Sequence, residues 1–169
     1  MRVKFFSEKI KAKKITKVIQ NKVKDILSSG QYTNSKYVAM FENIFKDFFK
    51  TKYCIAVNNG TSALHLSLLA LNIKKNDEVI VPSITFIASA AAITYVGAKP
   101  VFVDVNEHDW LINPNIIEKS ITKKTKAIMV VHLHGLMCDM NKIRNIAKKY
   151  KIKIIEDAAQ AHGSTYMNK

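Results

Sequence analysis

The segment Asn59-Gly60-Thr61-Ser62 is a candidate phosphate site, because it leads directly into an apolar helical run. Free backbone N–H groups and two hydroxyls at a helix N-terminus suit an anion. The segment is neither a P-loop nor a dinucleotide-binding motif, since GxxxxGK(S/T) and GxGxxG are both absent. The alternative is that Thr61 or Ser62 only caps the helix.

Two further positions suggest a ligand site, because each stands where a predicted strand ends. Asp157 closes one strand with Glu156 beside it, and adjacent strand residues point to opposite faces, so we expect only one carboxylate to enter a site. It could pair with a cationic ring nitrogen, bind a metal or cap the following turn. Phe86 follows another strand and could wall a pocket for a planar ligand, although core packing is the commoner role of phenylalanine.

The histidines His132 and His134 suggest a different chemistry, because residues two apart share one face of a strand. With Asp157 and His162 they could hold a metal ion, which would indicate a metal-dependent hydrolase or lyase. The alternative is one histidine packed in the core and one bonded to the backbone.

Alternating β-rich and helical segments position these groups from Lys52 onward. The predicted strands are Cys54–Val57, Glu78–Val81, Val101–Val105, Ala127–Val131 and Ile152–Ile155. The predicted helices between them are Ser62–Leu71, Phe86–Val96, Asn115–Ser120 and Asn141–Lys149. This alternation predicts an α/β fold with a mostly parallel sheet flanked by helices, and the uninterrupted apolar runs predict strands covered on both faces. The polar groups after the strands should then converge at their carboxyl ends.

The first fifty residues differ from the rest, because their apolar residues recur at helical spacing. They predict two amphipathic helices, over about Ile10–Leu27 and Tyr37–Phe49, with Gly30 ending the first. We therefore expect an N-terminal helical segment over residues 1–50 and an α/β domain over residues 51–169.

Composition argues against several classes of partner. The chain has 169 residues and a net charge of +14, but only Arg2 and Arg144 among its 27 basic residues are arginine. Nucleic-acid-binding proteins favour arginine, so dispersed lysines indicate a solvated surface instead.

The uncharged stretch 79–98 is long enough to span a membrane, yet its Ala, Ser and Thr content and Pro82 favour a buried strand and helix. Two distant cysteines form no disulfide framework. We expect a soluble, cytoplasmic protein that binds neither nucleic acid nor a membrane.

Four motifs in series resemble the DegT/DnrJ/StrS family of pyridoxal-phosphate-dependent sugar aminotransferases. They are NNGTSALHLSLLAL, DEVIVPSITFIASAAAITYVGAKPVFVDV, TKAIMVVHLHG and IIEDAAQAHGSTY. The resemblance covers about Gly30–Lys169, the N-terminal portion of the family's chain. It implies the large, cofactor-binding domain of the aspartate-aminotransferase-like fold, incomplete at the C-terminus. It also implies a homodimer that transfers an amino group, from glutamate, to a nucleotide-linked keto-sugar in polysaccharide or deoxyaminosugar biosynthesis.

The resemblance also assigns roles toward the cofactor, pyridoxal 5′-phosphate. The phosphate turn matches Gly60, Thr61 and Ser62, the ring-stacking aromatic matches Phe86, the partner of the ring nitrogen matches Asp157, and the partner of the phenolic oxygen matches Gln160. The family's Schiff-base lysine falls beyond Lys169, so we expect the 169-residue chain alone to bind cofactor weakly, lack transaminase activity and dissolve poorly. Two alternatives stay open: a sugar dehydratase of the same family with histidine in place of that lysine, and a non-catalytic remnant that serves as a dimerisation or regulatory partner.

Overall fold

The computed structural model describes residues 9–168, with side chains described from residue 15 onward. The chain divides into two compact units, residues 1–56 and residues 57–169.

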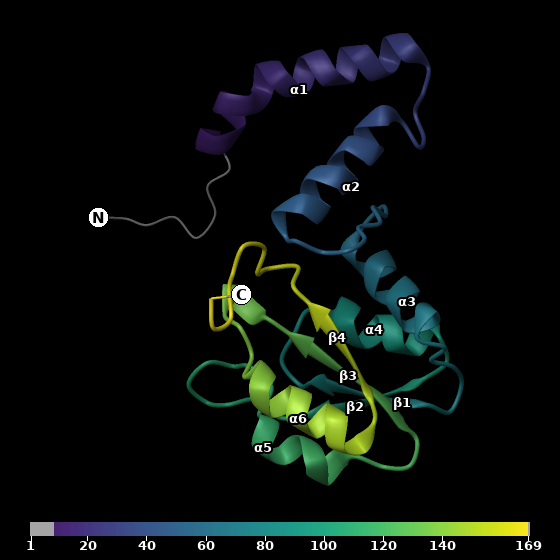
Figure 1. The fold of residues 1–169 in the computed structure, drawn as a ribbon, viewed down its shortest axis with the longest axis vertical. Coiled ribbons are helices and arrows are strands. Elements are labelled where there is room, and N and C mark those ends of the chain that lie inside the picture. Colours follow the sequence, from purple (N-terminus) through teal and green to yellow (C-terminus); the bar gives the residue numbers. More distant parts are fainter. Residues whose placement is uncertain (1–8, 169) are drawn as a thin grey trace. The chain divides into compact units, whose positions relative to one another are not determined.

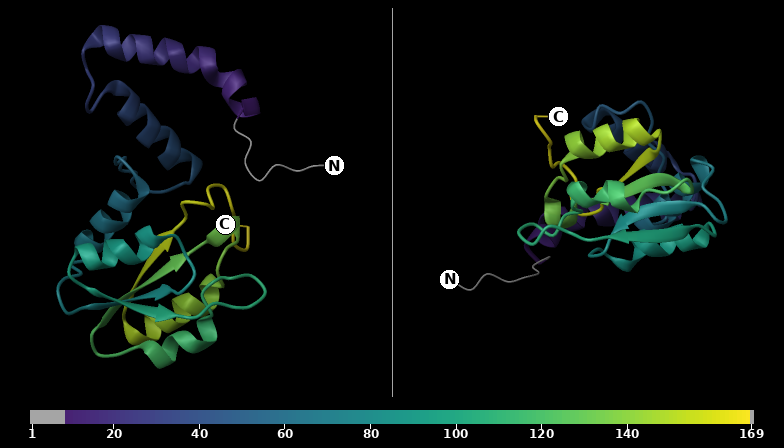
Figure 2. Two further views of the ribbon diagram at one scale, coloured as in Figure 1. Left: turned by 180° about the vertical axis from the view of Figure 1, so that it is seen from behind. Right: turned by 90° about the horizontal axis from the view of Figure 1, so that it is seen from below.

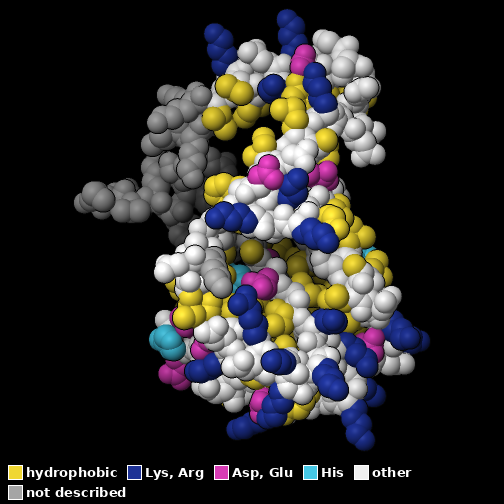
Figure 3. Space-filling view, viewed as in Figure 1, with side chains coloured by type: hydrophobic (Ala, Val, Ile, Leu, Met, Phe, Trp, Pro, Cys, Tyr) yellow, Lys and Arg dark blue, Asp and Glu magenta, His cyan; other side chains and the backbone are white. Residues whose placement is uncertain are grey.

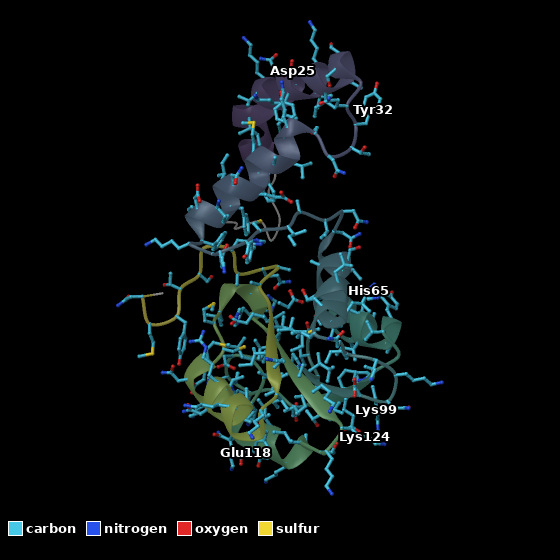
Figure 4. All side chains as sticks on the ribbon, turned by 45° about the vertical axis from the view of Figure 1, so that its right-hand side comes forward. Asp25, Tyr32, His65, Lys99, Glu118 and Lys124 are labelled. Atoms are coloured by element: carbon cyan, nitrogen blue, oxygen red, sulfur yellow. The ribbon has the colours of Figure 1, made fainter. Side chains whose placement is uncertain are left out.

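The first unit contains two helices, α1 (Lys9–Ser29) and α2 (Lys36–Phe48), which confirms the helical prediction for this region (Figure 1). Gly30 follows α1 with φ of 68°, a left-handed conformation that ends a helix readily in glycine. The Tyr37 hydroxyl donates a hydrogen bond to Asp25, labelled on α1 in Figure 4. This hydrogen bond is the main reason that the pKa of the Asp25 carboxyl is lowered, and the nearby Lys36 ammonium lowers it further.

The strand predicted at Cys54–Val57 is wrong. This segment is not part of a strand, and the side chain of Ile55 is 80% exposed. The Ala56 N–H, which a neighbouring strand would otherwise bind, donates instead to the Glu42 carboxylate at 2.8 Å. Apolar composition predicted the strand, but a strand also needs a partner for its hydrogen bonds, and none of the described strands provides one.

The second unit is built on four parallel strands in the order β2-β1-β3-β4. The strands are β1 (Glu78–Pro82), β2 (Lys99–Val103), β3 (Thr125–Val131) and β4 (Lys153–Asp157). The helices of this unit are α3 (Gly60–Ala70), α4 (Ile87–Tyr95), α5 (Pro114–Ile117) and α6 (Met140–Tyr150), with short 3-10 turns η1 (Glu118–Ser120) and η2 (Leu133–Gly135). The parallel α/β sheet predicted from the sequence is confirmed.

Helices cover both faces of this sheet, α3 and α4 on one and α5 and α6 on the other (Figures 1 and 2). Successive residues of β1 alternate between the two cores: Val79 and Val81 face α3 and α4, whereas Ile80 faces the core that contains α6. All three side chains are fully buried. Uninterrupted apolar strands therefore reflect burial on both faces, as predicted.

The surface carries its positive charge in a dispersed form. Figure 3 shows lysine and arginine side chains spread over the visible face rather than gathered in one patch. None of the described helices combines the length and apolarity needed to cross a bilayer. Cys54 and Cys138 are both free, and burial raises the pKa of the Cys138 thiol to about 12, which makes it a poor nucleophile.

Candidate active site

The strand order predicts a ligand site at the carboxyl ends of the strands. From β1 the chain crosses to β2 on one side and then returns to β3 on the other, so the connections diverge between β1 and β3. Such a switch point is where open α/β sheets bind ligands. Helix α3 begins at the end of the sheet where β3 and β4 finish (Figure 1). Lys99 and Lys124 lie at the opposite end, where β2 and β3 begin (Figure 4).

The hydroxyls of Thr61 and Ser62 take no part in capping α3. Asn59 is the helix cap, because its side-chain oxygen accepts from the Ser62 N–H at 2.8 Å. In the part of the chain that the structure describes, the hydroxyls of Thr61 and Ser62 have no hydrogen-bond partner. A side chain at Gly60 would meet no atom within 4 Å, so open space surrounds this turn. The alternative that Thr61 or Ser62 only caps the helix is therefore wrong.

The two carboxylates at the end of β4 point to opposite faces of the sheet, as predicted. Asp157 accepts a hydrogen bond from Ser89 of α4, whereas Glu156 contacts His132 at 3.1 Å on the other side. Ile155 and Ile154 show the same alternation, since they pack in the cores on the α4 and α6 sides respectively. Only Asp157 lies on the face shared with α3 and α4.

Asp157 is held at both of its carboxylate oxygens. Ser89 Oγ donates to Oδ2 at 2.9 Å, and the Ala159 N–H donates to Oδ1 at 3.1 Å. Thr85 Oγ1 lies 3.0 Å from Ser89 Oγ and extends the network toward the end of β1. Asp157 thus caps the following turn, one of the three roles considered, and it remains partly exposed for a further partner.

Phe86 is not a core residue, because its side chain is 69% exposed. It occupies the N-cap position of α4, where no side-chain cap bond forms. Ser, Thr, Asp and Asn are the residues that stabilise this position. A phenylalanine there contributes nothing to capping, so helix stability does not explain it.

Gln160 is oriented by the turn after β3. Its side-chain oxygen accepts from the backbone N–H of His134 at 2.8 Å, which leaves the amide NH₂ free to donate to a ligand oxygen. Gly135 completes this turn with φ of 85°, and a Cβ there would lie 3.4 Å from the Gln160 carbonyl. The turn after β3 therefore packs against the segment that follows β4.

The alternative of a metal site at the two histidines finds no support in the described residues. β3 ends at Val131, so His132 and His134 do not share a strand face, and that prediction is wrong. His132 is buried and accepts from the Cys138 N–H at Nδ1, so its Nε2 carries the proton and donates to Glu156. This hydrogen bond lowers the pKa of the Glu156 carboxyl. Residues 15–168 contain no group of three histidine, cysteine or acidic side chains that could hold a metal ion.

Sequence reasoning missed several residues of this site. Asn59 was placed in the turn but not recognised as its cap, although an asparagine directly before an apolar helix is a strong capping signal. Ser89 and Thr85 were not singled out at all. Nothing local marks Ser89, because its partner Asp157 lies 68 residues away in the sequence.

Comparison with known proteins identifies the class. Residues 13–169 match the DegT/DnrJ/EryC1/StrS aminotransferase family, and the chain belongs to that family. It is 50% identical, over 90% of its length and 42% of the relative's, to the dTDP-3-amino-3,6-dideoxy-alpha-D-galactopyranose transaminase of Aneurinibacillus thermoaerophilus.

Solved structures agree with this assignment. DesV of S. venezuelae matches with a TM-score of 0.95 and 38% identity, over 99% of this chain and 45% of that chain. NtdA of Bacillus subtilis, solved with bound cofactor PMP, matches with a TM-score of 0.87 and 39% identity, over 90% and 35%. The fold is that of the large domain of pyridoxal-phosphate-dependent aminotransferases, and the chain spans less than half of each of these proteins.

Proposed function

We propose that the protein transfers an amino group from an amino acid, with glutamate as donor, to a nucleotide-linked keto-sugar, using pyridoxal phosphate. The observation that carries this proposal is the doubly held carboxylate of Asp157 at the carboxyl end of β4. Two findings support it: the family match, and a relative that acts on a dTDP-linked sugar.

The chemistry of the donor set fits this cofactor. Two partnerless hydroxyls and the first N–H groups of α3 suit a dianionic phosphate, which the positive end of the helix dipole favours. The exposed ring of Phe86 suits a planar heterocycle, and a carboxylate suits a protonated ring nitrogen. The free amide of Gln160 suits an anionic phenolic oxygen.

Each residue then has a defined task. Thr61 and Ser62 bind and orient the phosphate, Phe86 covers one face of the ring, and Asp157 holds a proton on the ring nitrogen. Gln160 donates to the phenolic oxygen while the His134 backbone fixes its orientation. The bound cofactor supplies an electron sink for the carbon that loses its proton.

Two finer points complete the proposal. The active form is a homodimer with active sites at the interface. Its location is the cytoplasm, which the two free cysteines favour.

The test uses the full-length protein, expressed from the complete reading frame that contains this chain. It compares wild type with Asp157→Asn and with the matched control Glu156→Gln, which alters the adjacent carboxylate on the opposite face. Cofactor affinity is measured by absorbance and fluorescence titration. Amino transfer from glutamate and from aspartate is measured on dTDP-, UDP- and GDP-linked keto-sugars.

We expect Asp157→Asn to raise the cofactor Kd about 10- to 100-fold, because a hydrogen-bonded charge pair is worth about 1.5–3 kcal/mol. Glu156→Gln should stay within about threefold of wild type, since its partner is on the other face. Borohydride reduction and peptide mapping should identify the lysine that links the cofactor in the full-length protein. Loss of water from the sugar without amino transfer would indicate a dehydratase, and a wild-type protein that binds no cofactor would indicate a non-catalytic remnant.

A further inference from the structure

Ser89 of α4 differs from Ser67 and Thr94, two other hydroxyl residues within α3 and α4. Ser67 of α3 donates to the Ala63 carbonyl at 2.8 Å, and Thr94 of α4 donates to the Ala91 carbonyl at 2.7 Å. Such bonds to the preceding turn are the usual local choice of a hydroxyl in a helix. Ser89 instead donates to the carboxylate of Asp157 at 2.9 Å.

The side chain of Ser89 is fully buried, which makes the exception informative. A buried hydroxyl costs free energy unless it is hydrogen-bonded, and an alanine would satisfy the apolar core between α4 and the sheet without that requirement. The neighbouring positions Ala88, Ala90, Ala91 and Ala92 show that α4 uses alanine freely. A serine at this one position therefore has a task other than filling the core.

The direction of the hydrogen bonds follows from counting protons. An ionised Asp157 only accepts, so the single Ser89 hydroxyl proton points at Asp157 Oδ2. Ser89 Oγ can then only accept from its other neighbour, and Thr85 Oγ1 at 3.0 Å must donate to it. The result is a series of hydrogen bonds in which Thr85 donates to Ser89 and Ser89 donates to Asp157.

This series of hydrogen bonds fixes the rotation of the Asp157 carboxylate. The Ala159 N–H holds Oδ1 from the turn that follows β4, while Ser89 holds Oδ2 from α4, so the carboxylate plane is defined at both ends. Without Ser89 the group would keep one partner and could turn about its terminal bond. Thr85 immediately precedes Phe86, so the same segment that orients the carboxylate also presents the exposed ring.

We propose that Ser89, supported by Thr85, is a positioning residue that aims the Asp157 carboxylate at the ring nitrogen of the cofactor. This inference rests on the proposed function and adds a residue to it. Ser89 touches neither substrate nor cofactor in this proposal and acts only through Asp157.

The test compares four variants of the full-length protein by cofactor titration. Ser89→Ala removes the hydroxyl, Ser89→Thr keeps one, and Thr85→Val removes the outer member of the chain. Thr94→Val is the matched control, because Thr94 lies on the same helix but bonds to its own backbone. Each variant is titrated with pyridoxal phosphate and with its analogue in which carbon replaces the ring nitrogen.

We expect Ser89→Ala to raise the Kd for pyridoxal phosphate about tenfold, which corresponds to about 1.4 kcal/mol. Thr85→Val should raise it about two- to threefold, while Ser89→Thr and Thr94→Val should stay within about twofold of wild type. The Kd for the analogue should be the same in Ser89→Ala and in wild type, because the analogue has no ring nitrogen with which Asp157 could pair.

The outcomes separate the two proposals. A wild-type protein that binds no pyridoxal phosphate overturns the proposed function and this inference together. If wild type binds and Ser89→Ala binds equally well, only the inference fails. If Ser89→Ala loses as much affinity for the analogue as for pyridoxal phosphate, Ser89 has a purely structural role. If Ser89→Thr binds pyridoxal phosphate as weakly as Ser89→Ala does, the hydroxyl is not what positions Asp157.

Discussion

The turn at the start of α3 gives the sharpest prediction about the cofactor. The double variant Thr61→Val, Ser62→Ala removes two hydroxyls that have no partner in the described structure, and it retains the Ser62 N–H that Asn59 caps. The helix should therefore survive the change. Each hydroxyl would donate one hydrogen bond to the phosphate, and both positions are partly exposed, so water offsets part of the loss.

The magnitude follows from these two bonds. At about 1 kcal/mol each, their loss should raise the Kd for pyridoxal phosphate about 30-fold in the full-length protein. Affinity for pyridoxal, which lacks the phosphate, should not change. Ser67→Ala on the same helix is the control, because its hydroxyl bonds to the Ala63 carbonyl. A double variant that binds pyridoxal phosphate within about twofold of wild type, or that loses pyridoxal equally, would refute the phosphate assignment.

Two other predictions concern stability. The His132 hydrogen bond lowers the pKa of the Glu156 carboxyl below its ordinary 4.5. The bond to the ionised carboxylate therefore stabilises the fold above pH 4.5, and this contribution disappears as pH falls through the lowered value. Glu156→Gln should flatten urea-denaturation stability against pH in that acidic window, and an unchanged slope would contradict the pairing. Asp139 caps α6 by accepting from the Lys142 N–H at 3.2 Å. Asp139→Ala should lower unfolding free energy by about 1–2 kcal/mol, and Asp139→Asn by less; equal stability of all three proteins would argue against the cap.

The sequence predicted the parallel sheet well because the strands are short, apolar and separated by helical segments. The predicted bounds of all four observed strands lie within two residues of their actual ends. The strand at β2 was placed two residues late, because Lys99 and Pro100 are poor strand residues in isolation and pair here with Glu78 and Val79. The start of β2 is therefore determined by its pairing with β1, which local composition does not show.

The candidate site was predictable where a residue's position in the chain fixes its place in the fold. Asp157 ends β4 and Phe86 comes shortly after β1, and parallel topology brings strand ends to one edge. The histidine pair failed for the opposite reason: strand geometry was assumed for His134, which adopts φ of 57° in a turn. Ser89 could not be found at all, because its importance depends on a contact between α4 and β4 that only the tertiary structure shows.

The end of β4 is fixed from both faces, and this explains how two adjacent carboxylates serve different purposes. His132 donates through its backbone N–H to the Asp157 carbonyl at 3.0 Å and through its ring to Glu156 at 3.1 Å. It therefore holds the strand end in place without touching the Asp157 carboxylate. Ser89 acts on that carboxylate from the opposite face. Because the backbone is anchored on one side, the hydroxyl on the other can orient a side chain rather than an entire strand, which is the precision that the role proposed for Asp157 requires.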